Sequence, residues 1–424
     1  MRVLRALLVV VGLASPTFAL AAAPSPLLAL PADCRNANGS ADDAVRVVEA
    51  CTSGLKSSDA KGEKRAWMLY FRAYAYVEQG RFDDANADLN AAIEADPTID
   101  NLYHELSYVR TELGDYDGAE AAAAKAMQLA PTSLEHPKER AYARLQKGDY
   151  AGAAADYSSV LEREDDPAVR QILAFAHALN GDLDAARADL GKVDAKDVAN
   201  ASTYAGFANK VLDTLTPADK GSDPAGRCEK TFEGKFDKES ARVCTAAIRA
   251  AAAPAARADA LRARSLIWLY AIELNAAANS DIEAAVRLNP NDGGTIGQRC
   301  IVLTETATVK RQVKRAILDC NRALELCDKT DCKVAHMANR ANAYFRLEDY
   351  KSALADGEAI VKLQPDFHDG YRIRGEAKLG LGDKDGAKAD LTQARRLGGE
   401  SDYLKTLLAK VGVKMEDIPV SSSN

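Results

Sequence analysis

Residues 66–99 read AWMLYFRAYAYVEQGRFDDANADLNAAIEADPTI, and residues 100–133 read DNLYHELSYVRTELGDYDGAEAAAAKAMQLAPTS. The same spacing continues to Asp165, and recurring glycines, alanines and prolines mark it: Gly80, Gly114 and Gly148; Ala85, Ala119 and Ala153; Pro97 and Pro131. A fixed period of about 34 residues is the signature of a repeat protein, in which each unit is a supersecondary element stacked on its neighbours. The sequence therefore predicts a stack of similar units in place of one large globular core.

Counted from Ala66, the first unit carries large residues at positions 4, 11 and 24, small residues at positions 8, 20 and 27, and proline at position 32: Leu69, Tyr76 and Leu89; Ala73, Ala85 and Ala92; Pro97. This pattern resembles the tetratricopeptide repeat. The resemblance implies an all-α, right-handed solenoid of antiparallel helix pairs, with small residues where the two helices come closest. Four residues depart from the pattern: Arg110 and Arg144 replace the aromatic residue at position 11, and Gly357 and Ile360 stand where a large and a small residue are expected.

The pattern predicts two arrays in tandem. Residues 216–227 are rich in proline, glycine and serine, which is typical of a linker. On either side, Cys34 and Cys228 each open a cysteine pair with a glycine between its members and a threonine after it, Thr52 and Thr245. We expect an N-terminal array at 34–215, a C-terminal array at 228–412 closed by a helix from Tyr403 to Val411, and a polar tail at 413–424.

The first residues predict export. Arg2 and Arg5 precede a short apolar run, and Ala19-Leu20-Ala21 follows it, which is the pattern of a cleaved secretory signal peptide. The alternatives are a buried helix or a membrane anchor, but the run is too short to span a bilayer. We expect cleavage after Ala21, a flexible lead-in at 22–33, and a periplasmic or secreted mature chain without a transmembrane segment.

All eight cysteines lie beyond this segment, and an even number of cysteines in an exported chain indicates disulfides. In a helical hairpin, Cys300 and Cys320 lie level with each other, and a similar spacing predicts the pairs Cys34–Cys51 and Cys228–Cys244. Cys327 and Cys332 bracket a loop between two helices and are expected to form the fourth pair. A bridge that closes a loop of roughly 15 residues contributes about 3 kcal/mol. Zinc is the functional alternative, but no C-x-x-C motif or histidine cluster accompanies the cysteines. The cysteine-containing repeats resemble an exported bacterial type of tetratricopeptide-repeat protein.

Arginine and aspartate recur together at repeat positions 7 and 23: Arg72 and Asp88, Arg140 and Asp156, Arg340 and Asp356, Arg374 and Asp390. Aspartate recurs without the arginine at Asp189, Asp281 and Asp319. These positions lie on facing helices, so we expect a ladder of partly buried ion pairs that fixes the helix register. Clustered carboxylates could also serve acid and base catalysis, but these are spread one per repeat.

No catalytic motif accompanies the repeats. The sequence has no G-x-S-x-G, phosphate-binding loop or H-E-x-x-H, and its five histidines lack the spacing of metal ligands or of a catalytic base. The formal charge of −7 becomes −9 once Arg2 and Arg5 are removed, and an acidic chain without a basic cluster argues against nucleic acid as a partner. We expect no catalytic residues, cofactor or metal.

In the tetratricopeptide-repeat family, first-helix positions 2, 5, 9 and 12 line the concave groove. The candidate groove residues are therefore Trp67, Tyr70, Tyr74, His104, Tyr108, Asn342 and Arg372. The aromatic row of Trp67, Tyr70 and Tyr74 favours an interface, since aromatic residues commonly anchor interfaces. The alternative is that this row is core beneath the opening half-repeat.

Some members of the family bind the carboxyl end of a chaperone with lysines and asparagines at set groove positions. Asn342 fits one such position, but Ile373 stands where the next asparagine is expected and the lysines are missing. That binding mode is therefore not carried over.

The sequence thus favours an exported, disulfide-braced, non-catalytic scaffold that binds a protein or peptide in its groove. The alternatives are a cell-envelope glycan-binding protein, which needs Trp67 and Tyr70 exposed, and an accessory domain of an enzyme, which needs a deep polar pocket.

Overall fold

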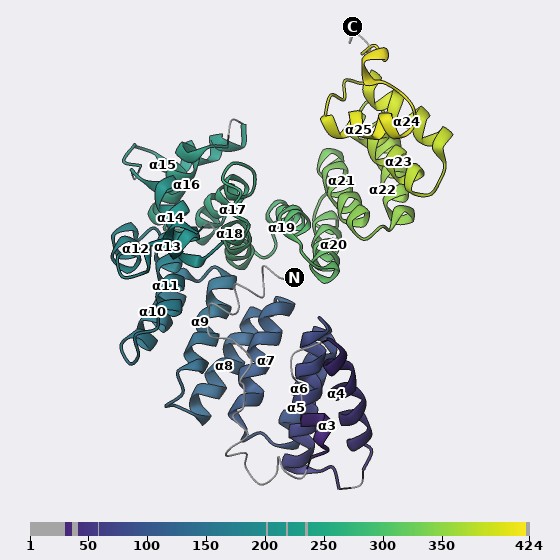
Figure 1. The fold of residues 1–424 in the computed structure, drawn as a ribbon. Coiled ribbons are helices and arrows are strands. Elements are labelled where there is room, and N and C mark those ends of the chain that lie inside the picture. Colours follow the sequence, from purple (N-terminus) through teal and green to yellow (C-terminus); the bar gives the residue numbers. More distant parts are fainter. Residues whose placement is uncertain are drawn as a thin grey trace. The chain divides into compact units, whose positions relative to one another are not determined.

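The computed structural model of the chain describes residues 30–35, 41–57, 59–200, 202–217, 219–233 and 236–420. The expected signal peptide, residues 22–29 of the expected lead-in and residues 421–424 of the expected tail lie outside these ranges. Within them, every regular element is a helix and none is a strand (Figure 1).

The chain divides after Thr216 into two compact units. The helices of unit 1 are α3 (Ala32–Arg35), α4 (Ala41–Gly54), α5 (Gly62–Glu78), α6 (Phe82–Ala95), α7 (Asp100–Leu113), α8 (Tyr116–Leu129), α9 (Glu135–Lys147), α10 (Tyr150–Leu161), α11 (Pro167–Asn180), α12 (Leu183–Leu190), α13 (Ala195–Ala199) and α14 (Tyr204–Leu215).

Unit 2 begins with Pro217. Its helices are α15 (Pro224–Glu229), η2 (Lys230–Glu233), α16 (Lys238–Ala250), α17 (Pro254–Tyr270), α18 (Asn275–Leu288), α19 (Gly293–Thr306), α20 (Lys310–Glu325), α21 (Thr330–Arg346), α22 (Tyr350–Leu363), α23 (His368–Gly380), α24 (Lys384–Arg396), α25 (Asp402–Lys410) and η3 (Met415–Asp417).

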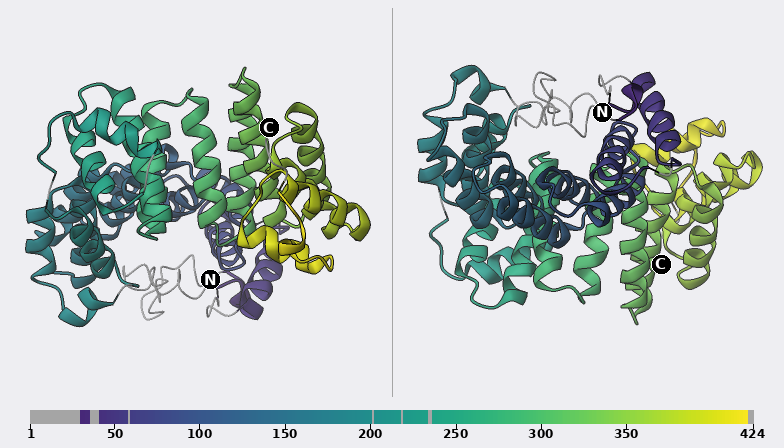
Figure 2. Two further views of the ribbon diagram at one scale, coloured as in Figure 1. Left: turned by 90° about the horizontal axis from the view of Figure 1, so that it is seen from above. Right: turned by 90° about the horizontal axis from the view of Figure 1, so that it is seen from below.

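Consecutive helices pack as pairs in each unit, and each pair packs on the next, as the views of Figure 2 also show. The predicted all-α solenoid of helix pairs is therefore confirmed. The last helix, α25, packs on α24 through Leu404, Leu407 and Leu408, which are almost fully buried.

The helices reverse direction at the repeating glycines. Gly80, Gly114 and Gly148 all have positive φ, a left-handed conformation that a side chain disfavours. Asp115 and Asp149 follow the second and third of these glycines, and each carboxylate accepts a hydrogen bond from a backbone N–H of the next helix, at Gly118 and Gly152. The recurring Gly-Asp pair therefore ends one helix and caps the next.

The small residues of the pattern lie between the two helices of a pair. Ala73, Ala85 and Ala119 are fully buried, and the hydroxyl of Ser107 donates to the carbonyl oxygen of Ala119 at 2.8 Å. That hydrogen bond crosses from α7 to α8, so the two backbones come close at this point.

The structure explains the unusual residues Gly357 and Ile360. A Cβ atom at Gly357 would lie 2.8 Å from the backbone nitrogen of Arg374, so α22 and α23 approach each other backbone to backbone there. Ile360 is fully buried against Gly370, where a Cβ atom would lie 2.7 Å from the isoleucine Cγ2. A small residue on one helix therefore faces a larger residue on the other, as Gly357 faces Arg374 and Gly370 faces Ile360. A comparison of single repeat positions cannot reveal this, because it does not consider the facing residue.

None of the described helices is both long and apolar enough to cross a membrane.

The close approach of α7 and α8 predicts the effect of enlarging one residue. Ala119→Leu adds three carbons to a packed contact and should lower the free energy of unfolding by about 1–3 kcal/mol. Ala121→Leu is the matched control, because Ala121 lies on the same helix and is exposed. Urea unfolding followed by circular dichroism measures both changes, and equal effects would contradict the packing described here.

Candidate functional site

Four cysteine pairs lie within bonding distance, and they are the four pairs expected from their spacing: Cys34 with Cys51, Cys228 with Cys244, Cys300 with Cys320, and Cys327 with Cys332. The first two pairs join the opening helices of their units, α3 to α4 and α15 to α16. The Cys300–Cys320 pair joins α19 to α20, and the last pair joins the loop before α21 to that helix. Each bridge therefore ties neighbouring elements of one unit together.

The four expected arginine–aspartate pairs are bidentate. In each, Nε and one terminal nitrogen of the arginine donate to the two carboxylate oxygens, at distances between 2.5 and 3.0 Å. The aspartates Asp88, Asp156, Asp356 and Asp390 are at most 7% exposed. These pairs cross from the first to the second helix of a hairpin, as repeat positions 7 and 23 require.

The three aspartates to which the sequence assigned no partner are also paired. Arg264 donates twice to Asp281 at 2.7 Å, and Arg299 donates to Asp319 at 2.8 and 2.6 Å. His177 Nδ1 lies 2.8 Å from Asp189. The sequence spacing hid these partners, because the residues are 17, 20 and 12 positions apart where the other hairpins have 16.

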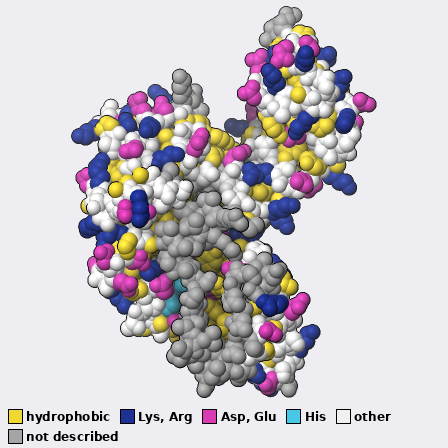
Figure 3. All heavy atoms as spheres, viewed as in Figure 1, with side chains coloured by type: hydrophobic (Ala, Val, Ile, Leu, Met, Phe, Trp, Pro, Cys, Tyr) yellow, Lys and Arg dark blue, Asp and Glu magenta, His cyan; other side chains and the backbone are white. Residues whose placement is uncertain are grey.

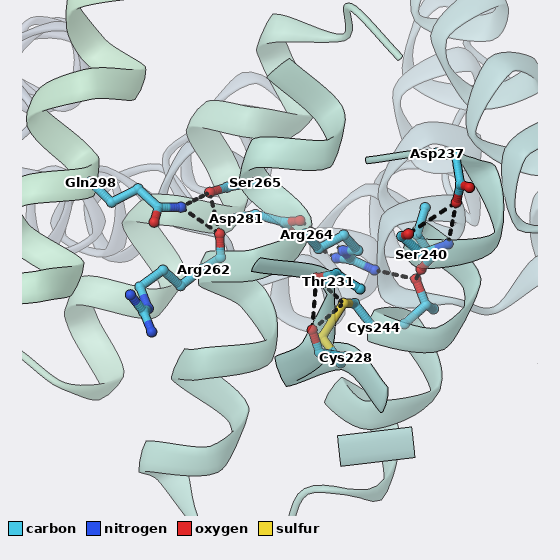
Figure 4. Close-up of a disulfide and its surroundings, with 12 residues drawn as sticks. Cys228, Thr231, Asp237, Ser240, Cys244, Arg262, Arg264, Ser265, Asp281 and Gln298 are labelled. Carbon is cyan, nitrogen blue, oxygen red and sulfur yellow. Dashed lines mark hydrogen bonds and ion pairs between the residues drawn. A yellow bond between two sulfur atoms is a disulfide. The ribbon is translucent and has the colours of Figure 1, made fainter. Parts of the chain in front are cut away.

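Some of these arginines also contact the preceding hairpin. A terminal nitrogen of Arg72 donates to the hydroxyl of Thr52 at 3.0 Å, and Arg264 donates to Thr245 at the same distance. Figure 4 shows Arg264 and Asp281 beside the Cys228–Cys244 bridge. In both units, therefore, the threonine after the second cysteine accepts a hydrogen bond from the first arginine of the arginine–aspartate ladder. This contact explains why the Cys-Thr pair recurs in the sequence.

The aromatic row has mixed exposure. Trp67 and Tyr70 are only 6% and 4% exposed, and their rings meet edge to face with centroids 5.4 Å apart. Both belong to the buried cluster that includes Val47 of α4, so they pack as core residues. Tyr74, by contrast, is partly exposed.

The remaining candidate groove residues are only partly accessible. His104 and Tyr108 of α7 and Asn342 of α21 are partly exposed. The guanidinium of Arg372 is engaged by carboxylates of its own helix, Asp369 at 2.8 Å and Glu376 at 3.1 Å. Arg372 therefore has little freedom to bind a ligand.

Several carboxylates of unit 1 that were not predicted as site residues lie among tyrosines. Burial raises the pKa of Glu105 to about 7, and the nearby charge of Glu78 adds to the rise. Burial also raises the pKa of Glu139 far above its usual range, with further contributions from Glu105 and Glu112. Glu139 is fully buried, and neither of its carboxylate oxygens has a hydrogen-bond partner among the described residues.

Tyrosines surround these carboxylates. Tyr142 donates its hydroxyl to Glu112 at 3.3 Å, and burial raises its pKa far above the usual range. We define the acidic tyrosine face as eight residues on α5, α7 and α9: Tyr70, Tyr74, Glu78, Glu105, Tyr108, Glu112, Glu139 and Tyr142. The shared repeat position of Glu105 and Glu139 was the available sequence signal, since equal repeat positions lie side by side in a stack.

A separate open hollow of about 360 Å³ lies between α12, α13 and α14. It is lined by residues of unit 1: Arg187, Leu190, Gly191, Val198, Asn209, Leu212, Asp213 and Thr216. It includes none of the residues that the sequence predicted as binding residues.

Comparison with known proteins identifies the repeats. Residues 68–99 and 100–133 match the family model of the tetratricopeptide repeat. These two segments of the chain are therefore tetratricopeptide repeats. The matched segments contain most of α5 and all of α6, α7 and α8, and so most of the acidic tyrosine face.

The curated relatives match a short part of the chain. The chain is 40% identical over 72 residues to the Hsp70-Hsp90 organizing protein of Triticum aestivum, which is 17% of this chain and 12% of that protein. It is 35% identical over 74 residues to the heat shock protein STI1 of Saccharomyces cerevisiae, which is 18% of this chain and 13% of that protein. The chain thus spans a small part of the length of the relatives that it matches.

Solved structures cover more of the chain at lower similarity. A tetratricopeptide repeat protein from Parabacteroides merdae covers 82% of this chain and 98% of its own at 15% identity, with a TM-score of 0.31. Yeast Tom70 covers 82% of this chain and 95% of its own at 15% identity, with a TM-score of 0.30.

The raised pKa of Glu139 predicts a pH dependence. Because the folded chain holds this proton above the pH at which the unfolded chain releases it, stability should fall as the pH rises through the raised pKa, by up to about 1.4 kcal/mol per pH unit. Burial lowers the pKa of His104 to about 4. This histidine therefore makes stability rise with pH, but only up to its ordinary pKa of 6.5, above which its contribution no longer changes. The range from about pH 6.5 to pH 8.5 therefore isolates the carboxyl groups.

Calorimetric unfolding of the wild type and Glu139→Gln over that range tests this prediction. The unfolding temperature of the wild type should fall with rising pH, and that of Glu139→Gln should fall less. Glu164→Gln is the control, because Glu164 is exposed. Parallel curves for all three proteins would contradict the assignment.

Proposed function

We propose that the chain is an exported scaffold that binds a protein or peptide through the first helices of unit 1, without catalysis. The repeats that match the family lie in this region. A protein that is 40% identical to this chain over 72 residues is named for organising Hsp70 and Hsp90. A stack of paired helices supports such a role because it presents an extended surface built from equivalent positions.

Four disulfides support the exported location. Such bonds persist in oxidising compartments and are rare where thiols are kept reduced. The signal peptide expected at Met1 to Ala21 belongs to the same proposal, which places the mature chain in the periplasm or outside the cell.

The acidic tyrosine face carries the proposal about the partner. Buried carboxylates close to like charges are stabilised by an opposite charge, and tyrosine rings attract cations through their faces. Tyr74, Glu78, Tyr108 and Glu112 are partly exposed, so a partner can reach this face. Glu105 lies beneath it, and its carboxyl group adds negative charge when it ionises at a pH of about 7. The partner that fits is a protein segment with lysine or arginine side chains.

Two alternatives have less support. A glycan would stack on exposed aromatic faces, but Trp67 and Tyr70 are buried. For the ladder carboxylates, a structural role is favoured over acid and base catalysis, because each aspartate is held by an arginine or a histidine. On the face drawn in Figure 3, acidic and basic side chains are interspersed, and we propose no nucleic-acid partner.

Fluorescence anisotropy with labelled peptides tests this function. A lysine-rich peptide should bind, an acidic peptide of equal length should not, and added salt should weaken the binding. Affinity should rise with pH through about 7, because ionisation of Glu105 adds negative charge to the face.

The double variant Glu105→Gln/Glu112→Gln should weaken binding about tenfold, which corresponds to about 1.4 kcal/mol. Glu162→Gln/Glu164→Gln removes the same charge from exposed positions of unit 1 and serves as the control. Equal binding of the acidic peptide, or equal losses in both double variants, would refute the proposed face.

A further inference from the structure

Three side chains at the start of α21 lie close enough to share one ligand. The sulfur atoms of Cys327 and Cys332 and a ring nitrogen of His336 all lie within 4.8 Å of one another. Cys332 and His336 are four residues apart on α21 and therefore lie on one face of the helix. Cys327 reaches them from the loop that follows α20.

The imidazole of His336 lies in a tight space. The residue is 7% exposed, and its Nδ1 is buried without a hydrogen-bond partner among the described residues. The ring packs on Gly297 of α19, where a Cβ atom would lie only 2.2 Å from the ring carbon Cε1. Gly297 therefore leaves room for the imidazole ring. A buried polar nitrogen without a hydrogen-bond partner is energetically unfavourable, and a bound ligand could satisfy it.

The bridge beside this ring differs from the other three. Cys332 is partly exposed, whereas the six cysteines of the other bridges are at most 2% exposed. The Cys327–Cys332 bridge also closes a loop of 5 residues, while the others span 16 to 20. The exposure of Cys332 makes this bridge the most accessible of the four. A bridge that closes a short loop contributes least to stability, so its opening should disturb the fold least.

We propose that reduction of the Cys327–Cys332 bridge creates a site for a thiophilic cation, Zn²⁺ or Cu⁺, held by the two thiolates and the imidazole of His336. Thiolate and imidazole ligands select these cations. With metal–ligand distances of about 2.0 to 2.3 Å, tetrahedral ligand atoms lie about 3.5 to 3.8 Å apart. After reduction the two sulfur atoms must therefore separate by about 1.8 Å from their bonded distance of about 2.0 Å, and the imidazole nitrogen must approach by up to about 1 Å.

The redox step needs a dithiol reductant. The sulfur–sulfur bond accepts two electrons and two protons from the dithiol, which becomes a disulfide, and the two cysteines become thiols. Metal binding then displaces the two thiol protons, because the thiolate is the ligand. Oxidation closes the bridge again and releases the ion, so the site would respond to the redox state of the compartment.

Titration of the full chain with a metal ion tests the proposal. The protein is treated with a dithiol, freed of reductant without oxygen, and titrated with Zn²⁺ against a chromophoric chelator; a second titration uses Cu⁺. The reduced chain should bind one ion of at least one of the two metals, and the oxidised chain should bind none. Failure of the reduced chain to compete for either ion would overturn the proposal.

Variants separate this site from the other cysteines. Cys327→Ser/Cys332→Ser keeps the other six cysteines and should abolish the binding. His336→Gln should weaken it by at least about tenfold, while His368→Gln, at a partly exposed position of unit 2, should not change it. Circular dichroism of the reduced variants checks folding. Wild-type affinity in the double cysteine variant, or in His336→Gln, would refute the assigned ligands.

Discussion

The bidentate contact between an arginine of one helix and an aspartate of the next is the interaction on which six of the described hairpins depend. Two parallel hydrogen bonds fix both the distance and the orientation of the groups, which a contact between apolar side chains does not. A buried ion pair adds little net stability, but loss of one partner leaves a charge that cannot be hydrated. The pair therefore favours one alignment of the two helices over neighbouring alignments.

The same arginine also joins successive hairpins. Arg72 and Arg264 donate to a threonine next to the opening disulfide of their unit, and Arg340 donates to Asn321, which follows Cys320, at 2.7 Å. In all three cases, the residue that accepts the hydrogen bond directly follows a disulfide-bonded cysteine, so the disulfide fixes the helix that carries this residue. A chain of contacts therefore runs from one hairpin to the next: from the disulfide to the acceptor residue beside it, and from there to the arginine and its aspartate. Small residues such as Ala73 and Ala85 let the helices come close enough for these contacts.

Regular spacing places equivalent residues of successive repeats side by side. Glu105 and Glu139 occupy the same repeat position, so their carboxyl groups lie close together and the charge of Glu105 raises the cost of ionising Glu139. A globular domain of the same composition would separate such charges. In this chain the repeat itself concentrates them on the first helices of unit 1, where tyrosines from the same helices surround them.

Much of this architecture follows from the sequence, because the fixed repeat period carries the turns, the small residues and the level positions of paired cysteines. The partners of Asp281 and Asp319 did not follow, since longer connections between the helices shift the spacing while the geometry stays the same. The sequence also did not determine whether Trp67 and Tyr70 are buried, because aromatic residues spaced along one face of a helix can pack in a core or face the solvent. The place of His336 did not follow either, because a disulfide between Cys327 and Cys332 uses both sulfur atoms and leaves no ligand set in the sequence for the histidine one turn along α21.

A double-mutant cycle on Arg264 and Asp281 tests most directly whether the ion pair fixes the hairpin. Both side chains are at most 1% exposed, and Trp268 beside them, which donates to Asp281 at 2.8 Å, reports unfolding by fluorescence in a Trp67→Phe background. Arg264→Met and Asp281→Leu should each cost about 3–5 kcal/mol, and the double variant should cost less than their sum by about 1–3 kcal/mol. Additive costs, within about 0.5 kcal/mol, would contradict this account.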